Sequence, residues 1–177
     1  MLLTQLGLTF TIDPSTIDEV IDAALAPAGI VETLADQKAA DVAARHPDAD
    51  LVLGADTIVV LDERKLGKPT DRAEAARMLR GIAGRWHQVY TGYSLIAPGG
   101  ERVVGHAISD VRIRDLSDAE IEAYINTGEP MDKAGSYAIQ EVGTLLVAEI
   151  KGCYTNIVGL PLPSVDAAWR ALGWSVI

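Results

Sequence analysis

The sequence predicts an α/β protein in which helices pack on a buried sheet. The first indication is the run at residues 51–61, where every residue is apolar or glycine except Asp56 and Thr57. A continuous apolar run of this kind is typical of a strand buried on both faces of a sheet. The second indication is that amphipathic segments with capping signals alternate with further strand-like stretches. At 177 residues the chain fits a single domain over residues 1–177, with room for two lobes.

Composition excludes several classes of partner. The formal net charge of −10 argues against a broad basic surface for DNA or RNA. No apolar stretch is long enough to span a membrane, and the N-terminus lacks the pattern of a secretory signal. Cys153 is the one cysteine, so the sequence offers no disulfide framework or thiolate metal cluster. We therefore expect a cytoplasmic protein with no nucleic-acid or membrane partner.

Residues 1–28 carry two acidic candidate residues. Residues 1–10 are expected to form the last turns of a helix that ends at Gly7. The following loop contains Asp18 and Glu19, which are either solvated loop acids or groups with a catalytic or metal-binding role.

The segment 31–45 is predicted to be a helix that ends before Pro47. Lys38 falls within its apolar stripe, between Leu34 and Val42. Two interpretations are open. Either the aliphatic stem of Lys38 packs on the apolar stripe while its ammonium reaches water, or the ammonium points into a cleft between this helix and the sheet.

Asp56 stands inside the apolar run. An ionised carboxylate there is costly unless a metal, a cation or several donors meet it. Asp56 is therefore either a functional group or the end of a strand, where Asp56 and Thr57 turn the chain.

The tripeptide Gly67-Lys68-Pro69 follows this strand. Pro69 forces Lys68 into an extended conformation, and Gly67 lets the backbone come close to whatever Lys68 contacts. The glycine spacing of a P-loop is absent. A helix over residues 72–80 begins with a capping-box-like pair, Asp71 and Glu74.

The second half of the chain predicts more strands and helices. A strand ending at residue 96 and another over 102–114 are joined by a turn at 98–100, and His87 is expected to be structural or on the surface. A capping box at Ser117 and Glu120 opens a helix that ends at Gly128. Residues 129–141 are predicted to be an ordered functional loop. A hairpin over 144–150 and 154–158 and a final helix after Pro161 complete the chain.

Seven short motifs together resemble the Maf family, over residues 1 to about 172. They are Gly54-Ala55-Asp56-Thr57, Gly67-Lys68-Pro69, Val89-Tyr90-Thr91-Gly92, Thr127-Gly128-Glu129-Pro130, Asp132-Lys133-Ala134-Gly135, Tyr137-Ala138-Ile139-Gln140 and Val158-Gly159-Leu160-Pro161. The resemblance implies an elongated α/β fold related to the inosine triphosphate pyrophosphatases. It also implies a mixed sheet, a nucleotide cleft between two lobes and a possible homodimer.

The activity implied by the resemblance is hydrolysis of a nucleoside triphosphate, dTTP or UTP, to the monophosphate and pyrophosphate with a divalent metal of the Mg or Mn type. Asp56 matches the family's base, and Thr57 and Gln140 match positions that mark the dTTP and UTP branch. The residues assigned in this way are Asp56, Lys68 and Lys38 as catalytic, Thr57, Gln140, Lys133 and Asp132 as substrate-binding, and Glu19 with Asp56 as metal ligands.

One part of the family pattern is not found in these residues. The resemblance implies an opening strand and a Ser-x-Ser-Pro-Arg-Arg loop before the first helix, and we expect the chain to be truncated relative to the family. The missing arginines leave a second hypothesis open, a non-catalytic module that binds nucleotide or a partner in cell division. A purine-specific enzyme is disfavoured by Thr57 and Gln140.

Overall fold

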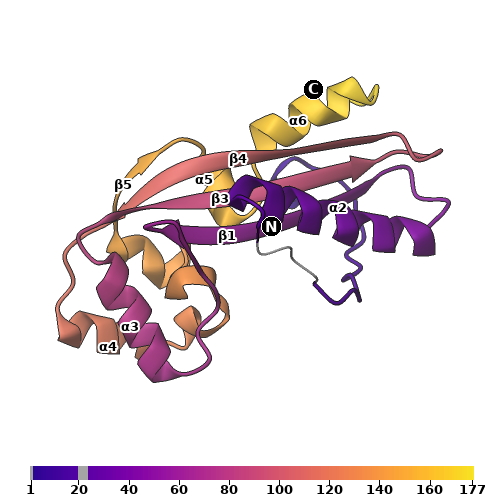
Figure 1. Cartoon of the computed structure of the whole chain (residues 1–177). Coiled ribbons are helices and arrows are strands. Elements are labelled where there is room, and N and C mark those ends of the chain that lie inside the picture. Colours follow the sequence, from indigo (N-terminus) through magenta and orange to yellow (C-terminus); the bar gives the residue numbers. More distant parts are fainter. Residues whose placement is uncertain (1, 20–23) are drawn as a thin grey trace. The chain divides into compact units, whose positions relative to one another are not determined.

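The computed structural model describes residues 2–19 and 24–177 of the chain. Within these residues the chain forms a five-stranded sheet of the order β2-β1-β3-β4-β5 together with several helices, so the predicted α/β class is confirmed (Figure 1). In chain order the elements are α1 (Leu2–Gln5), α2 (Pro27–Arg45), β1 (Val52–Leu61), β2 (Arg64–Leu66), α3 (Arg72–Ile82), β3 (Trp86–Ile96), β4 (Arg102–Ile113), α4 (Asp118–Asn126), η1 (Glu129–Asp132), η2 (Ala134–Ser136), η3 (Glu141–Leu146), β5 (Val147–Lys151), α5 (Tyr154–Val158) and α6 (Leu162–Ala171).

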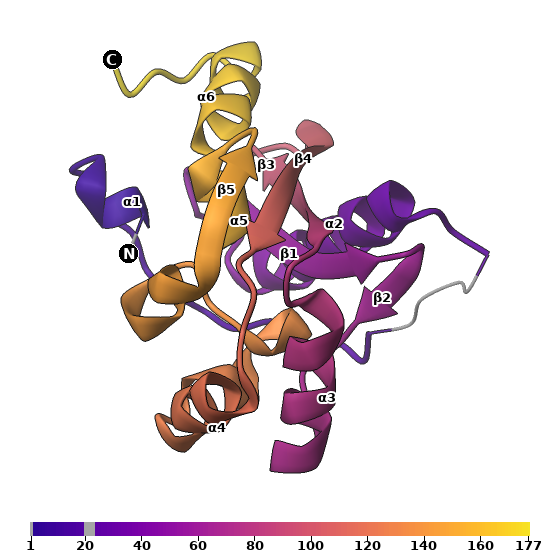
Figure 2. The same ribbon diagram turned by 90° about the vertical axis from the view of Figure 1, so that its left-hand side faces the viewer.

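Short antiparallel partners flank the long strands. β2 pairs with β1, placing Val59 opposite Leu66, and β5 pairs with β4, with a register shift between Arg112 and Ile113. Figure 2 shows β2 and β5 at the two edges of the sheet. The predicted strands at residues 51–61 and 102–114 are confirmed to within one residue at each end.

Two compact units make up the chain. The first contains Met1–Asp56, Thr91–Ala107 and Gly159–Ile177, and the second contains Thr57–Tyr90 and Ile108–Val158. The strands β1, β3 and β4 each contribute residues to both units. The prediction of a single domain over residues 1–177 stays a prediction, as do the elongated shape and the cleft between lobes.

In the first unit, two glycines let α2 pack directly on the sheet. A Cβ on Gly54 of β1 would lie 2.5 Å from the carbonyl oxygen of Ala35 and 2.8 Å from the amide nitrogen of Ala39. A Cβ on Gly92 of β3 would lie 2.1 Å from the carbonyl oxygen of Val31. Because a side chain at either position would collide with helix backbone, these glycines fix how closely α2 approaches.

The strand residues that alternate with these glycines point to the other face, where α6 packs. That cluster contains Tyr93, Leu95, Val165, Ala168 and Trp169, with Leu3, Leu51 and Leu53 packed against it. The strands of the first unit are therefore covered on both sides, as the apolar run at residues 51–61 predicts.

The second unit has its own core, in which α3 and α4 lie side by side (Figures 1 and 2). Asp71 caps α3 by accepting a hydrogen bond from the Glu74 amide at 2.7 Å. Ser117 and Glu120 form a complete capping box at the start of α4. Both predicted helix starts are confirmed. The largest cluster of buried side chains lies beneath them and includes Leu79, Ile82, Val111, Ile113, Ile121 and Ile125.

The predicted hairpin at residues 144–158 is wrong in its second half. Residues 141–146 form η3, β5 begins only at Val147, and Tyr154–Val158 is the helix α5. The buried Asn156 amide donates to the Val89 carbonyl at 3.0 Å and to Ser109 Oγ at 2.9 Å. A β-branched sequence thus becomes helical because tertiary hydrogen bonds outweigh local propensity.

His87 was expected to be structural or on the surface, and its burial excludes the surface position. Its Nε2 lies 2.7 Å from the hydroxyl of Tyr137, and the two rings meet edge to face. Its Nδ1 is buried and has no hydrogen-bond partner among the described residues. Burial lowers the pKa of His87 from 6.5 to about 4, although the charge of Asp110 opposes the shift.

This depressed pKa predicts an acid-dependent loss of stability. Between pH 6.5 and about 4 the unfolded chain protonates His87 while the folded chain does not, so stability falls as the pH falls. The loss amounts to at most about 3.5 kcal/mol at about 1.4 kcal/mol per pKa unit. Urea unfolding from pH 7.5 to 4.5 is expected to show a flatter pH dependence for His87→Gln than for the wild type. Equal slopes would contradict the prediction.

Candidate active site

Asp56 lies within β1, which continues to Leu61, so it does not mark a strand end. Because side chains alternate along a strand, Asp56 points to the same face as Gly54, the face that α2 covers. Lys38 lies in α2 next to Ala39, the residue against which Gly54 packs. Lys38 Nζ donates a hydrogen bond of 2.7 Å to Asp56 Oδ1. The Asp56 side chain is 12% exposed and that of Lys38 is 25% exposed, so this ion pair is partly shielded from water.

Lys38 also binds the third predicted residue of this unit. Its Nζ lies 2.8 Å from Glu19 Oε1, so one ammonium bridges two carboxylates. Burial by itself would lower the pKa of Lys38, but the hydrogen bonds and charges of Asp56 and Glu19 outweigh it and raise that pKa. Lys38 is therefore a firmly charged cation aimed at the sheet.

The loop before Glu19 is tied to the end of α2. Asp41 Oδ2 accepts hydrogen bonds of 2.9 Å from Ser15 Oγ and from the Thr16 amide. Arg45 donates to the Pro14 carbonyl at 3.0 Å and pairs with Asp13. These bonds fix the chain that leads to Glu19 on the helix that carries Lys38.

Glu19 and Asp56 are the two predicted metal ligands. Among residues 2–19 and 24–177, no cluster of three or more histidine, cysteine or acidic side chains is arranged to hold a metal ion. Glu19 and Asp56 nevertheless converge on one positive charge, the Lys38 ammonium. Magnesium is often held by one or two carboxylates together with water and substrate phosphates. Two carboxylates that already contact the Lys38 ammonium would hold such a metal only together with water and substrate phosphates.

A pocket in the second unit brings together three of the predicted substrate-binding residues. Asp132, Lys133 and Gln140 line this pocket of about 450 Å³. The other residues that line it are Thr127, Glu129, Ala138, Glu141 and Val142. Loop 129–141, predicted to be ordered and functional, supplies much of the wall.

A backbone hydrogen bond brings Lys68 to the same loop. The Gly135 amide donates to the Gly67 carbonyl at 3.0 Å, which joins the two predicted motifs. Lys133 Nζ donates to Asp132 Oδ2 at 2.9 Å. That bond and the charges of Lys133 and Lys68 hold the pKa of Asp132 below its ordinary value. The exposed Lys68 thus adds positive charge near the loop.

Thr57 is half-buried and is not among the residues that line this pocket. It follows Asp56 in β1 and points to the opposite face of the strand. Its predicted role in substrate binding stays a prediction.

Sequence reasoning did not assign a role to Tyr124 or Glu129. Glu129 accepts hydrogen bonds from Tyr124 Oη and from the amides of Val142 and Gly143, at 2.8, 3.1 and 3.0 Å. These partners are 5 to 14 positions away in the sequence, so no local pattern marks them. The available signals were that Glu129 belongs to one of the seven motifs, Thr127-Gly128-Glu129-Pro130, and that loop 129–141 was predicted to be ordered.

Comparison with known proteins gives consistent matches over nearly the whole chain. A family model described as "Maf-like protein" matches residues 1–172. The chain is 54% identical to the dTTP/UTP pyrophosphatase of Moorella thermoacetica, over 99% of this chain and 90% of that protein. It is 44% identical to the enzyme of the same name from Desulforamulus reducens, over 99% and 92%. It is 49% identical to that of Gloeobacter violaceus, over 92% and 84%.

Proposed function

Because the chain belongs to the Maf family, we propose that it is a nucleoside triphosphate pyrophosphatase acting on dTTP and UTP. The structural observation that carries this proposal is the Lys38 ammonium held between Asp56 and Glu19 on one face of the sheet. The names of relatives with 44–54% identity support the choice of substrate.

Asp56 is the proposed base. It takes a proton from a water molecule at a carboxylate oxygen while the water oxygen attacks the α-phosphorus. The bond from the α-phosphorus to the bridging oxygen breaks, and pyrophosphate leaves. The short contact with Lys38 keeps the carboxylate in one orientation, which is what a positioned base requires.

The lysines supply charge that the protein otherwise lacks. A triphosphate is repelled by a chain of net charge −10 unless cations gather locally. Lys38 and Lys68 offset the negative charge on the phosphates as the leaving group departs. Three of the five lysines in the chain have a predicted role in the reaction, Lys38 in the first unit and Lys68 and Lys133 in the second.

Glu19 and Asp56 would hold the divalent metal, which when bound neutralises phosphate charge and polarises the phosphoryl oxygens. We further propose that the pocket around Gln140 accepts the base. Three carboxylates line this pocket, those of Glu129, Asp132 and Glu141, against the one ammonium of Lys133, so the pocket suits the polar edge of a pyrimidine better than it suits the phosphates.

The test is release of pyrophosphate and nucleoside monophosphate from a panel of eight ribo- and deoxyribonucleoside triphosphates, with Mg²⁺ or Mn²⁺ and with EDTA. We expect dTTP and UTP to be hydrolysed at least about tenfold more efficiently than the others, and activity to be lost in EDTA. Nucleotide-dependent thermal stabilisation without turnover would support the non-catalytic module instead, which the names of the relatives do not favour.

Two further expectations concern the setting of the enzyme. None of the helices in residues 2–19 and 24–177 is long and apolar enough to cross a membrane. A cytoplasmic location and a homodimer stay predictions.

A further inference from the structure

Gln140 lies in an exposed turn whose position needs an explanation. The side chain lines the pocket, yet the residue is exposed and follows the buried Ile139 directly. An amide on an exposed turn selects a base only if its oxygen and nitrogen are held in one orientation. The contacts that hold this turn therefore affect which base the pocket selects.

Both ends of the turn at residues 138–143 are tied to one pair of side chains. The Ala138 amide donates to Tyr124 Oη at 3.1 Å, at the start of the turn. The amides of Val142 and Gly143, at its end, donate to the two carboxylate oxygens of Glu129 at 3.1 and 3.0 Å. Tyr124 Oη in turn donates to Glu129 Oε1 at 2.8 Å, so the two side chains that hold the ends of the turn are bonded to each other.

The backbone of the turn is drawn tightly onto this pair. A Cβ on Gly143 would lie 2.1 Å from the Ala138 carbonyl oxygen, 2.6 Å from Tyr124 Oη and 2.9 Å from Glu129 Oε1. Glu141, in the middle of the turn, has a φ of +55°, which is rare for a residue other than glycine. Such a conformation persists where the surroundings over-determine it, as the hydrogen bonds to Tyr124 and Glu129 do here.

The Tyr124–Glu129 pair is anchored in the core of the second unit. Tyr124 is 3% exposed and belongs to the core cluster beneath α4, the helix that the Ser117 capping box anchors. Burial raises the pKa of Tyr124, so its hydroxyl stays protonated and able to donate to Glu129. Glu129 also lines the pocket, so the wall and the support of the turn are one structure.

We propose that Tyr124 and Glu129 are positioning residues that hold the Gln140 turn and thereby set base selectivity. This inference rests on the proposed function. Neither residue takes part in the attack on phosphorus. Their loss is therefore expected to weaken recognition of the base more than it slows the chemical step.

The test uses Glu129→Gln and Tyr124→Phe in the full chain. Glu129→Gln keeps the size but puts an N–H₂ group where backbone amides already donate, and Tyr124→Phe removes one donor and one acceptor. We expect KM for UTP to rise about tenfold and kcat to change less than about threefold. The ratio of kcat/KM for UTP over CTP should fall about tenfold. Glu122→Gln, on the exposed side of α4, and Tyr154→Phe, at an exposed tyrosine, should match the wild type.

Binding of the non-hydrolysable α,β-imido analogues of UTP and CTP, measured by calorimetry, separates this inference from the proposed function. If the wild type binds the UTP analogue selectively but turns nothing over, the proposed function fails. A loss of selectivity in the two variants then still supports the positioning role. Unchanged selectivity in the folded variants overturns it, as does a uniform loss of kcat for every nucleotide. Failure of the wild type to bind either analogue also overturns it.

Discussion

Replacement of Asp56 by asparagine is expected to lower kcat for UTP at least about hundredfold while the protein stays folded. A positioned general base contributes about 10²- to 10⁴-fold, and an asparagine amide cannot accept the proton. The substitution is nearly isosteric, and Lys38 keeps Glu19 as a partner, so the local packing survives. The measurement is steady-state pyrophosphate release, with urea unfolding to confirm that the variant is folded.

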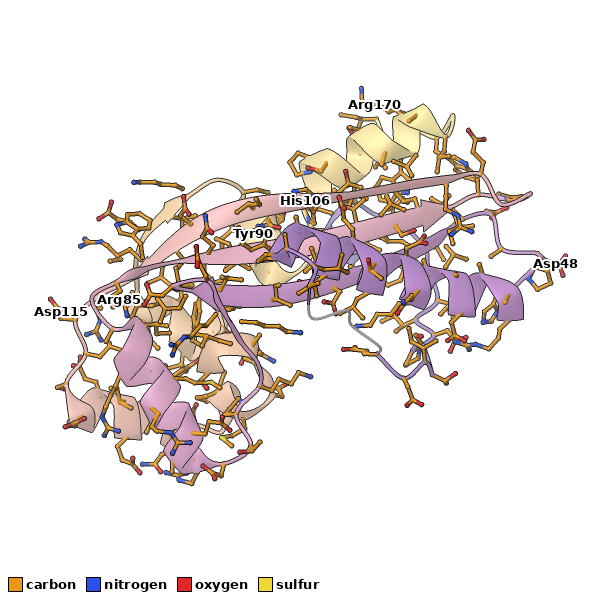
Figure 3. The ribbon with its side chains drawn as sticks, in the orientation of Figure 1. Asp48, Arg85, Tyr90, His106, Asp115 and Arg170 are labelled. Carbon is orange, nitrogen blue, oxygen red and sulfur yellow. The ribbon has the colours of Figure 1, made fainter. Side chains whose placement is uncertain are left out.

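Asp48→Asn is the matched control. Asp48 is an exposed aspartate of the same unit, in the loop between α2 and β1 (Figure 3). Asp48→Asn changes the net charge by the same amount as Asp56→Asn. A general electrostatic effect on an anionic substrate would therefore appear in both variants. We expect Asp48→Asn to keep kcat within about twofold. An Asp56→Asn enzyme that keeps a third or more of the wild-type rate would exclude Asp56 as the base.

Local patterns account for the features that the sequence predicts well. The sequence signals lie in contiguous residues for the strand at residues 51–61 and for the helix starts at Asp71 and Ser117. The positions of Asp56 and Lys38 follow from two periodicities: the strand alternates every second residue, and the helical stripe puts Lys38 next to buried positions. Patterns of this kind need no knowledge of the rest of the fold.

Features that depend on distant partners were not predictable in the same way. Residues 154–158 have strand-like composition, but Asn156 finds its partners at Val89 and Ser109, far away in the sequence. The hydrogen bonds that hold the Gln140 turn join α4, η1 and η3, and no rule of sequence spacing predicts them. Such bonds become visible only when the elements are placed together.

Gly54 shows how the two kinds of information combine. The sequence marks it as the first residue of a motif, but only the structure shows that its missing side chain lets α2 reach β1. The ion pair of Lys38 with Asp56 depends on that approach, because Lys38 lies beside Ala39, which touches Gly54. A change at Gly54 should therefore reduce both stability and activity.

Gly54→Ala is expected to destabilise the protein by about 3 kcal/mol, at the upper end of the cost of overpacking. The new Cβ would lie 2.5 Å from the Ala35 carbonyl oxygen, and a backbone atom cannot rotate out of the way. The helix must move off the strand, which lengthens the contact between Lys38 and Asp56. We expect the midpoint of urea unfolding to fall and kcat to fall at least about tenfold in the protein that stays folded.

The same substitution at Gly81 is the control, with the opposite sign expected. Gly81 lies in α3, and the nearest atom to its Cβ would be Leu61 Cδ2 at an ordinary 3.9 Å. Alanine is favoured over glycine within a helix, so Gly81→Ala should raise stability by up to about 1 kcal/mol and leave kcat unchanged. If both variants shift the midpoint alike, glycine content rather than close packing governs stability. If Gly54→Ala is as stable and active as the wild type, the tight contact between α2 and β1 does not organise the site.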